Sequence, residues 1–125
     1  MKSAKDFLTE ANAVVPRISG EEALGHYGKD DAVFIDVRDS KDIANSGTIK
    51  GALRIPRGFI EFAADDTMPY HHKELSRDKS IYLVCAAGGQ AALAGKTLVD
   101  MGYSKVTNIG GISEWKEAGG AMDDA

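Results

Sequence analysis

The chain has 125 residues, a formal net charge of −4 at pH 7 and one cysteine. The length is typical of a single domain, the lone cysteine excludes a disulfide within the chain, and the acidic balance argues against nucleic acid or an anionic membrane as the main partner. No apolar stretch approaches the ~20 residues of a membrane span, and the N-terminal residues lack a signal-peptide core, so the sequence predicts a cytoplasmic protein.

Helix and strand patterns alternate through the first half of the chain. Ser3 and Ser19 each precede an acidic residue by three positions, which predicts capping boxes at helices over residues 3–13 and 19–26. The nearly continuous apolar run over 32–37 predicts a strand buried on both faces, as in a parallel sheet. The other elements expected here are an extended segment at 17–18, a helix over 40–45, a strand over 52–55 and a helix over 59–64.

The second half begins with an irregular polar stretch over 65–79. The apolar run over 81–85 predicts the central strand, and a helical pattern over 90–101 ends at Gly102, which suits a left-handed C-cap. The remaining residues predict a strand over 105–109, a turn at 110–111, a helix over 112–118 and a frayed tail over 119–125. This alternation is typical of an α/β domain with a parallel sheet, in which ligands bind beyond the carboxyl ends of the strands.

Cys85 ends the central strand and is followed by a loop of small residues. A junction of strand, loop and helix points backbone N–H groups at any anion in its mouth, and positive potential of this kind lowers the pKa of a thiol. A reactive thiolate is therefore one interpretation of Cys85. A buried structural cysteine is the other, because free cysteines are among the most buried residues.

Other chemistries that this region suggests fit less well. The stretch from Gly89 to Thr97 resembles a phosphate-binding loop, but five residues instead of four separate Gly89 from Gly95. A cysteine phosphatase needs an arginine shortly after the nucleophile, and the six residues after Cys85 include none. A cysteine protease needs a histidine base, for which His71 and His72 are candidates, although a solvated pair in a surface loop is favoured.

Charged residues stand at two further predicted strand ends. Arg38 is expected to form a structural ion pair with Asp36 and to reach Asp42 on the following helix. Arg54 and Arg57 are candidates to attract an anionic substrate, and a solvated surface position is the alternative for both.

Several stretches, in this order, resemble the rhodanese-like (thiosulfate sulfurtransferase) domain family. They are Asp36-Val37-Arg38, residues 47–52 with Ile55-Pro56, residues 81–90, and residues 101–103 with Gly110-Gly111 and Trp115. The resemblance implies an α/β fold of three layers, in which helices flank a mostly parallel central sheet of about five strands. It divides the chain into an N-terminal helical extension (1–14), one rhodanese-like domain (15–120) and a tail (121–125).

The resemblance implies that Cys85 takes sulfane sulfur from thiosulfate or from a persulfide or polysulfide donor. The resulting persulfide would pass its outer sulfur to cyanide or to an acceptor thiol, which can belong to a protein, without a cofactor or a metal ion. The backbone amides expected to bind the sulfur belong to Ala86, Ala87, Gly88, Gly89, Gln90 and Ala91.

Three departures from the family pattern bear on this function. Thr48 stands where the family often has histidine, and Ala86 and Gln90 replace residues that are often basic. The missing charges argue against efficient use of dianionic thiosulfate unless Arg54, Arg57 or residues 71–73 contribute. Two alternatives to a sulfurtransferase are a binding or adapter module that keeps the fold without catalysis, and a thiol-redox or arsenate-reducing enzyme.

Overall fold

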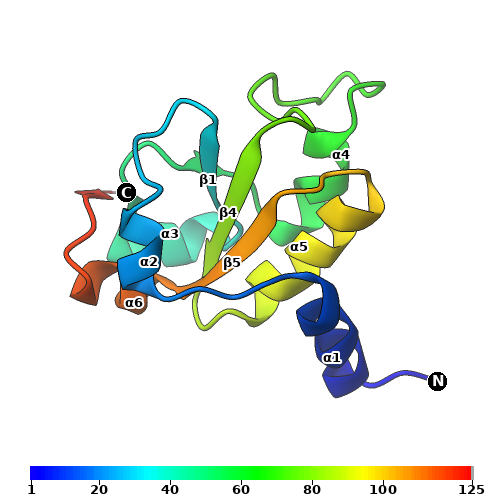
Figure 1. Ribbon diagram of the computed structural model, residues 1–125, viewed down its shortest axis with the longest axis horizontal. Coiled ribbons are helices and arrows are strands. Elements are labelled where there is room, and N and C mark those ends of the chain that lie inside the picture. Colours follow the sequence, from blue (N-terminus) through cyan, green and yellow to red (C-terminus); the bar gives the residue numbers. More distant parts are fainter. Residues whose placement is uncertain (125) are drawn as a thin grey trace.

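The computed structural model describes residues 1–124 and places a four-stranded parallel sheet at the centre of the molecule (Figure 1). The spatial order of its strands is β3-β1-β4-β5. The strands are β1 (Ala32–Asp36), β3 (Leu53–Arg54), β4 (Ser80–Cys85) and β5 (Val106–Gly111). An isolated parallel bridge between Arg17 and Asn108 adds an extended segment beside β5. The predicted α/β class and mostly parallel sheet are confirmed.

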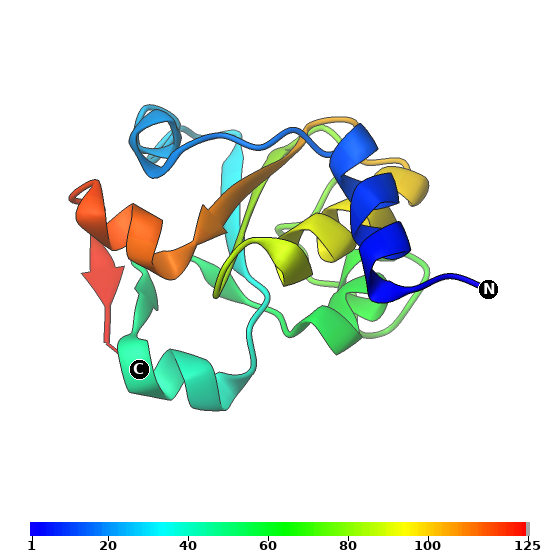
Figure 2. The ribbon, with the colours of Figure 1, turned by 90° about the horizontal axis from the view of Figure 1, so that it is seen from below.

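Helices cover both faces of the sheet (Figure 2). One face carries α1 (Ala4–Val14), α4 (Ile60–Ala64) and α5 (Gly89–Asp100), and the other carries α2 (Gly20–Leu24) and α6 (Ile112–Glu117). A short 3₁₀ turn, η1 (Arg57–Phe59), leads into α4, and α3 (Ser40–Ser46) follows β1. The remaining strands, β2 (Thr48–Ile49) and β6 (Met122–Asp123), form a separate antiparallel pair.

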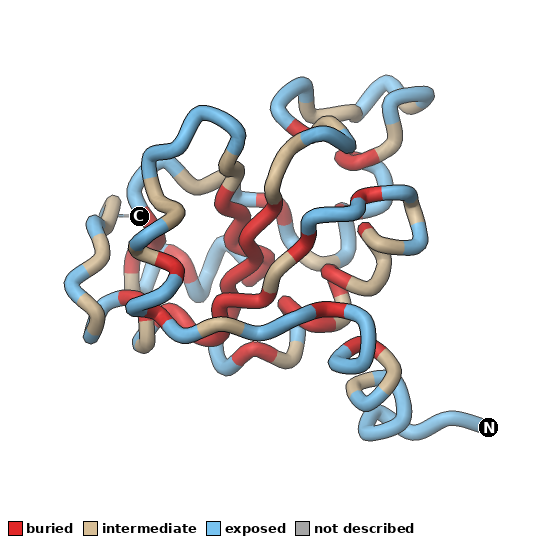
Figure 3. The backbone as a smooth tube through the Cα atoms, in the orientation of Figure 1, coloured by how far each residue is buried: buried red, intermediate tan, exposed pale blue. Residues whose placement is uncertain are grey.

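The alternation of side chains along β4 explains where Cys85 points. Ile81, Leu83 and Cys85 pack into the apolar cluster beneath α5, whereas Tyr82 and Val84 pack into the cluster beneath α6, as the two-residue repeat of a strand requires. Buried residues accordingly follow β1 and β4 through the middle of the molecule (Figure 3). The continuous apolar run in the sequence reflects this burial on both faces.

Local sequence signals predicted the helix ends correctly. The two predictions that fail, a turn and a frayed tail, fail because strands pair there with distant residues. Both capping boxes form, at Ser3 and at Ser19, and Gly102 follows α5 with a φ of +97°. The turn predicted at 110–111 is wrong because both glycines belong to β5. The frayed tail is also wrong for residues 119–124, since β6 pairs with β2 and the Trp115 indole donates a hydrogen bond to the Ala121 carbonyl; residue 125 lies outside the described residues.

A buried ion pair fixes the chain beyond β1. The Asp36 side chain is fully buried and accepts hydrogen bonds from Nε and Nη2 of Arg38 and, at 2.7 Å, from the Thr48 hydroxyl. Arg38 also donates to the Ser46 hydroxyl and the Gly47 carbonyl. Among residues 1–124 these are the side-chain partners of Arg38, so the predicted contact with Asp42 is wrong. The Arg38 side chain turns back toward the end of α3 rather than lying along the helix.

The substitution Asp36→Asn tests this network, with Asp42→Asn as its control. Removing the buried carboxylate leaves the Arg38 guanidinium without its counter-charge, and we expect a loss of about 3–5 kcal/mol in the free energy of unfolding. Asp42 is exposed, so its substitution is expected to change that free energy by no more than ~0.5 kcal/mol. Urea unfolding of both variants measures the difference, and equal losses would contradict the assignment.

Candidate active site

Cys85 lies at the carboxyl end of β4, where the chain turns through a short loop into α5 (Figure 1). Its Sγ accepts a hydrogen bond from the Gly88 N–H at 3.0 Å and another from the Ala91 N–H at 3.4 Å. Ala91 belongs to the first turn of α5, so the positive end of the helix dipole adds to these two donors. The arrangement stabilises negative charge on sulfur.

Two glycines and one asparagine fix the path of the loop. Gly88 is the N-cap of α5 and has a φ of +104°, which an L side chain rarely adopts. The buried Asn108 side chain donates to the Gly88 carbonyl at 2.9 Å and accepts from the Gly110 N–H at 2.8 Å. A Cβ on Gly111 would lie 2.3 Å from the Ala86 carbonyl oxygen. The end of β5 therefore supports the loop from one side.

Fewer loop amides contact the sulfur than the six that the sequence predicted. Among residues 1–124, the hydrogen bonds to Cys85 Sγ come from Gly88 and Ala91. Ala86, Ala87 and Gln90 are exposed, and Gly89 is half-buried at the first position of α5. Cys85 itself is 1% exposed, so the sulfur lies beneath the loop rather than at an open surface.

The two candidate arginines, one at the end of β3 and one just after it, lie in different grooves. Arg57 shares a groove of about 600 Å³ between α1 and α5 with the loop residue Gly89. Its guanidinium donates to Glu61 and to the Thr97 hydroxyl. Arg54 lines a smaller groove of about 140 Å³ with Arg38 and donates to the Asp124 carbonyl. Arg57 therefore lines a groove that reaches Gly89 at the start of α5, whereas the groove beside Arg54 does not.

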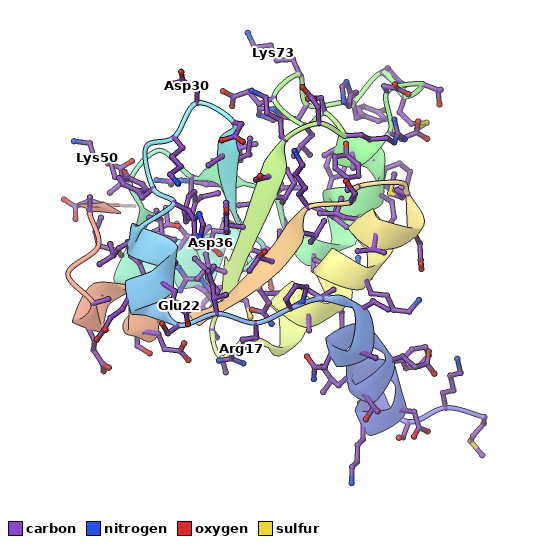
Figure 4. The ribbon with its side chains drawn as sticks, in the orientation of Figure 1. Arg17, Glu22, Asp30, Asp36, Lys50 and Lys73 are labelled. Atoms are coloured by element: carbon purple, nitrogen blue, oxygen red, sulfur yellow. The ribbon has the colours of Figure 1, made fainter. Side chains whose placement is uncertain are left out.

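The histidines and Lys73 of the irregular segment lie far from the cysteine. Residues 65–79 lead into the amino end of β4, opposite the loop that follows Cys85, and Figure 4 shows Lys73 at that end. His71 Nε2 contacts the Leu75 carbonyl at 2.8 Å, and His72 Nδ1 accepts from the Glu74 N–H. These contacts are local, and the segment contributes no base to the cysteine site.

Three residues at the site were missed by sequence reasoning. Arg17 donates to the Ala87 carbonyl at 3.5 Å and forms an ion pair of 2.9 Å with Glu114 of α6; Figure 4 shows it beside the loop. Asn108 is the third. Its one sequence signal was a polar residue inside a predicted strand, two positions before the glycine pair.

Residues 1–124 contain no cluster of three or more histidine, cysteine, aspartate and glutamate side chains placed to hold a metal ion. None of the helices in this part of the chain is both long and apolar enough to cross a membrane.

The chain is similar to a known protein family and to several of its members. A family model described as a rhodanese-like domain matches residues 19–118. A sulfurtransferase of Allochromatium vinosum is 30% identical over 72% of this chain and 77% of its own length. The adenylyltransferase and sulfurtransferase UBA4 of Meyerozyma guilliermondii is 34% identical over 68% of this chain. The chain spans 20% of that protein and 58% of a further relative from Bacillus subtilis.

Solved structures share the fold. A protein of unknown function from Rhodopseudomonas palustris, described as a possible tyrosine phosphatase, is 36% identical with a TM-score of 0.90 over 98% of this chain and 96% of that one. The polysulfide-sulfur transferase homodimer of Wolinella succinogenes is 29% identical with a TM-score of 0.70 over 94% and 85%.

The substitution Asn108→Ala tests whether this side chain supports the loop. It removes the acceptor of the Gly110 N–H and one of the two donors to the Gly88 carbonyl, which keeps the Ala92 N–H. Leaving the buried Gly110 N–H unpaired is expected to cost about 1–3 kcal/mol of unfolding free energy. Loosening the loop should also speed alkylation of Cys85 by iodoacetamide. The control Asn12→Ala changes an exposed residue of α1 and should alter neither. Unchanged alkylation in the Asn108 variant would contradict the role.

Proposed function

Given that the chain belongs to the rhodanese-like domain family, we propose that it is a sulfurtransferase that carries sulfane sulfur as a persulfide on Cys85. The family match and the relatives named as sulfurtransferases support sulfur transfer at the family level. The observation that carries the proposal for this chain is the pair of N–H groups on Cys85 Sγ. A free cysteine is only about 3% thiolate at pH 7, and the thiolate is the nucleophile.

In the first step the Cys85 thiolate attacks the outer sulfur of the donor. A bond forms between Sγ and that sulfur, the donor's own bond to it breaks, and the electron pair leaves with the rest of the donor. Thiosulfate releases sulfite, and a polysulfide releases a chain shortened by one sulfur. The product, Cys85–S–S⁻, keeps one negative charge on its outer sulfur, next to the Sγ that accepts from the Gly88 and Ala91 amides. N–H groups directed at this sulfur pair would stabilise that charge.

In the second step an acceptor attacks the outer sulfur of the persulfide. An acceptor thiolate becomes a persulfide and cyanide becomes thiocyanate, and the electron pair of the broken S–S bond returns to Cys85 as a thiolate. Cys85 is thus regenerated without an oxidant or a reductant. The absence of basic side chains over residues 86–91 favours persulfide or polysulfide donors, which concentrate less charge than thiosulfate.

The burial of Cys85 favours one competing function, a binding module that keeps the fold without catalysis. At 1% exposure the thiol needs a donor slender enough to pass between loop residues, or a small opening of the loop. Sulfane sulfur meets the first condition, because only one atom has to reach Sγ. A module without catalysis would leave the thiol unmodified by every donor.

Mass spectrometry of the intact protein tests the proposal. After incubation with polysulfide and removal of excess reagent, we expect the mass to rise by the ~32 Da of one sulfur, and the added sulfur to leave with cyanide as thiocyanate. The matched control is Cys85→Ser, because a hydroxyl cannot hold sulfane sulfur; it should gain no mass. No adduct with polysulfide or thiosulfate, or equal turnover of the serine variant, would overturn the proposal in favour of a binding module.

A further inference from the structure

The Arg17 guanidinium occupies the space directly outside the cysteine loop. A Cβ built on Gly88 would lie 2.3 Å from Arg17 Nη1, and one built on Gly110 would lie 2.8 Å from Nη2. Nη1 also donates to the Ala87 carbonyl at 3.5 Å. The absence of side chains at Gly88 and Gly110 is therefore what lets a guanidinium lie against the loop that binds Cys85.

The positive charge beside the cysteine loop comes from a residue outside the loop. Residues 86–91 carry no charged side chain, and Arg17 comes from the extended segment that bridges to β5 at Asn108. That bridge fixes the backbone of Arg17 beside the middle of β5, and from there the side chain reaches the loop. A distant segment thus delivers a positive charge to a loop that supplies none of its own.

Glu114 of α6 offsets this charge. Its carboxylate lies 2.9 Å from Arg17 Nη2, and the side chains of Arg17 and Glu114 are 46% and 41% exposed. A guanidinium has five N–H donors, and the contacts to Ala87 and Glu114 leave others facing solvent. An anion approaching the loop therefore meets a cation whose field is largely cancelled by its neighbour.

We propose that the Arg17–Glu114 pair sets the charge of the sulfur donor that the site accepts. The inference rests on the proposed function and deepens it. Arg17 positions the donor's anionic group, and Glu114 limits the attraction so that singly charged donors compete with the dianion. Neither residue touches Cys85 Sγ, so both act on donor selection rather than on the chemistry at sulfur.

Two donors that differ by one charge separate this role from a structural one. Thiosulfate, with charge −2, converts the Cys85 thiolate to the persulfide and releases sulfite. Methanethiosulfonate ion, with charge −1, gives the same persulfide and releases methanesulfinate. Each reaction breaks one S–S bond and forms one, and total charge is conserved. The ratio of the two rate constants for persulfide formation, followed by mass spectrometry in a single turnover, isolates the effect of donor charge.

Substitutions on the two sides of the pair should move this ratio in opposite directions. Glu114→Gln is expected to raise the rate with thiosulfate relative to methanethiosulfonate about threefold, and Arg17→Gln to lower it about threefold, as for exposed and screened charges. Arg17→Lys keeps the charge and should stay within about twofold of the parent ratio. High salt should bring all ratios together, because ions screen exposed charges.

The control variant Glu74→Gln changes the net charge by the same amount as Glu114→Gln. Glu74 lies on the segment before β4, at the opposite end of the sheet, so this variant should leave the ratio of the thiosulfate and methanethiosulfonate rate constants unaltered. If Glu114→Gln and Arg17→Gln change both donors equally, the pair is merely structural and the inference is overturned. The inference is also overturned if Glu114→Gln fails to react with thiosulfate while polysulfide still modifies Cys85. If polysulfide also fails with the parent protein, the proposed function itself falls.

Discussion

The parallel alignment of four strands brings the functional groups of this chain to one edge of the sheet. β1, β3, β4 and β5 all end at that edge, so residues far apart in sequence meet there. Cys85 ends β4 opposite Gly111 of β5, and the residue before it, Val84, lies opposite Asp36 at the end of β1. Reversing any one of these strands would carry its terminal residues to the opposite end, beside residues 65–79.

Two buried polar networks stand on either side of the cysteine loop. Beyond β1, the Asp36 carboxylate joins Arg38 to Thr48 and, through Arg38, to the end of α3. On β5, the Asn108 side chain joins the loop at Gly88 to the strand backbone at Gly110. Within residues 1–124, no buried side-chain nitrogen or oxygen lacks a hydrogen-bond partner. Both networks are therefore complete, which is the condition under which buried polar groups make a structure more rigid.

The sequence carried enough local information for the elements and for the cysteine loop, but not for its surroundings. Capping boxes, apolar runs and the glycines after Cys85 are short-range signals, and they located the helices, the sheet and the thiol. The pairing of β6 with β2 and the approach of Arg17 to Gly88 join residues more than 70 positions apart. No periodicity encodes such contacts. The predicted pair of Arg38 with Asp36 formed, but the contact with Asp42 that helical spacing suggested did not, because the Arg38 guanidinium also binds the Ser46 hydroxyl and the Gly47 carbonyl.

The electrostatics of the site divide into a part that solvent cannot screen and a part that it can. The N–H groups of Gly88 and Ala91 reach a sulfur that is 1% exposed, so their stabilisation of a persulfide should persist at high salt. The Arg17–Glu114 pair is nearly half exposed, and ions weaken its field. Retention of bound sulfur and selection of the donor therefore have separate physical origins. Substituting the surface pair should alter which donors react while leaving the lifetime of the Cys85 persulfide unchanged.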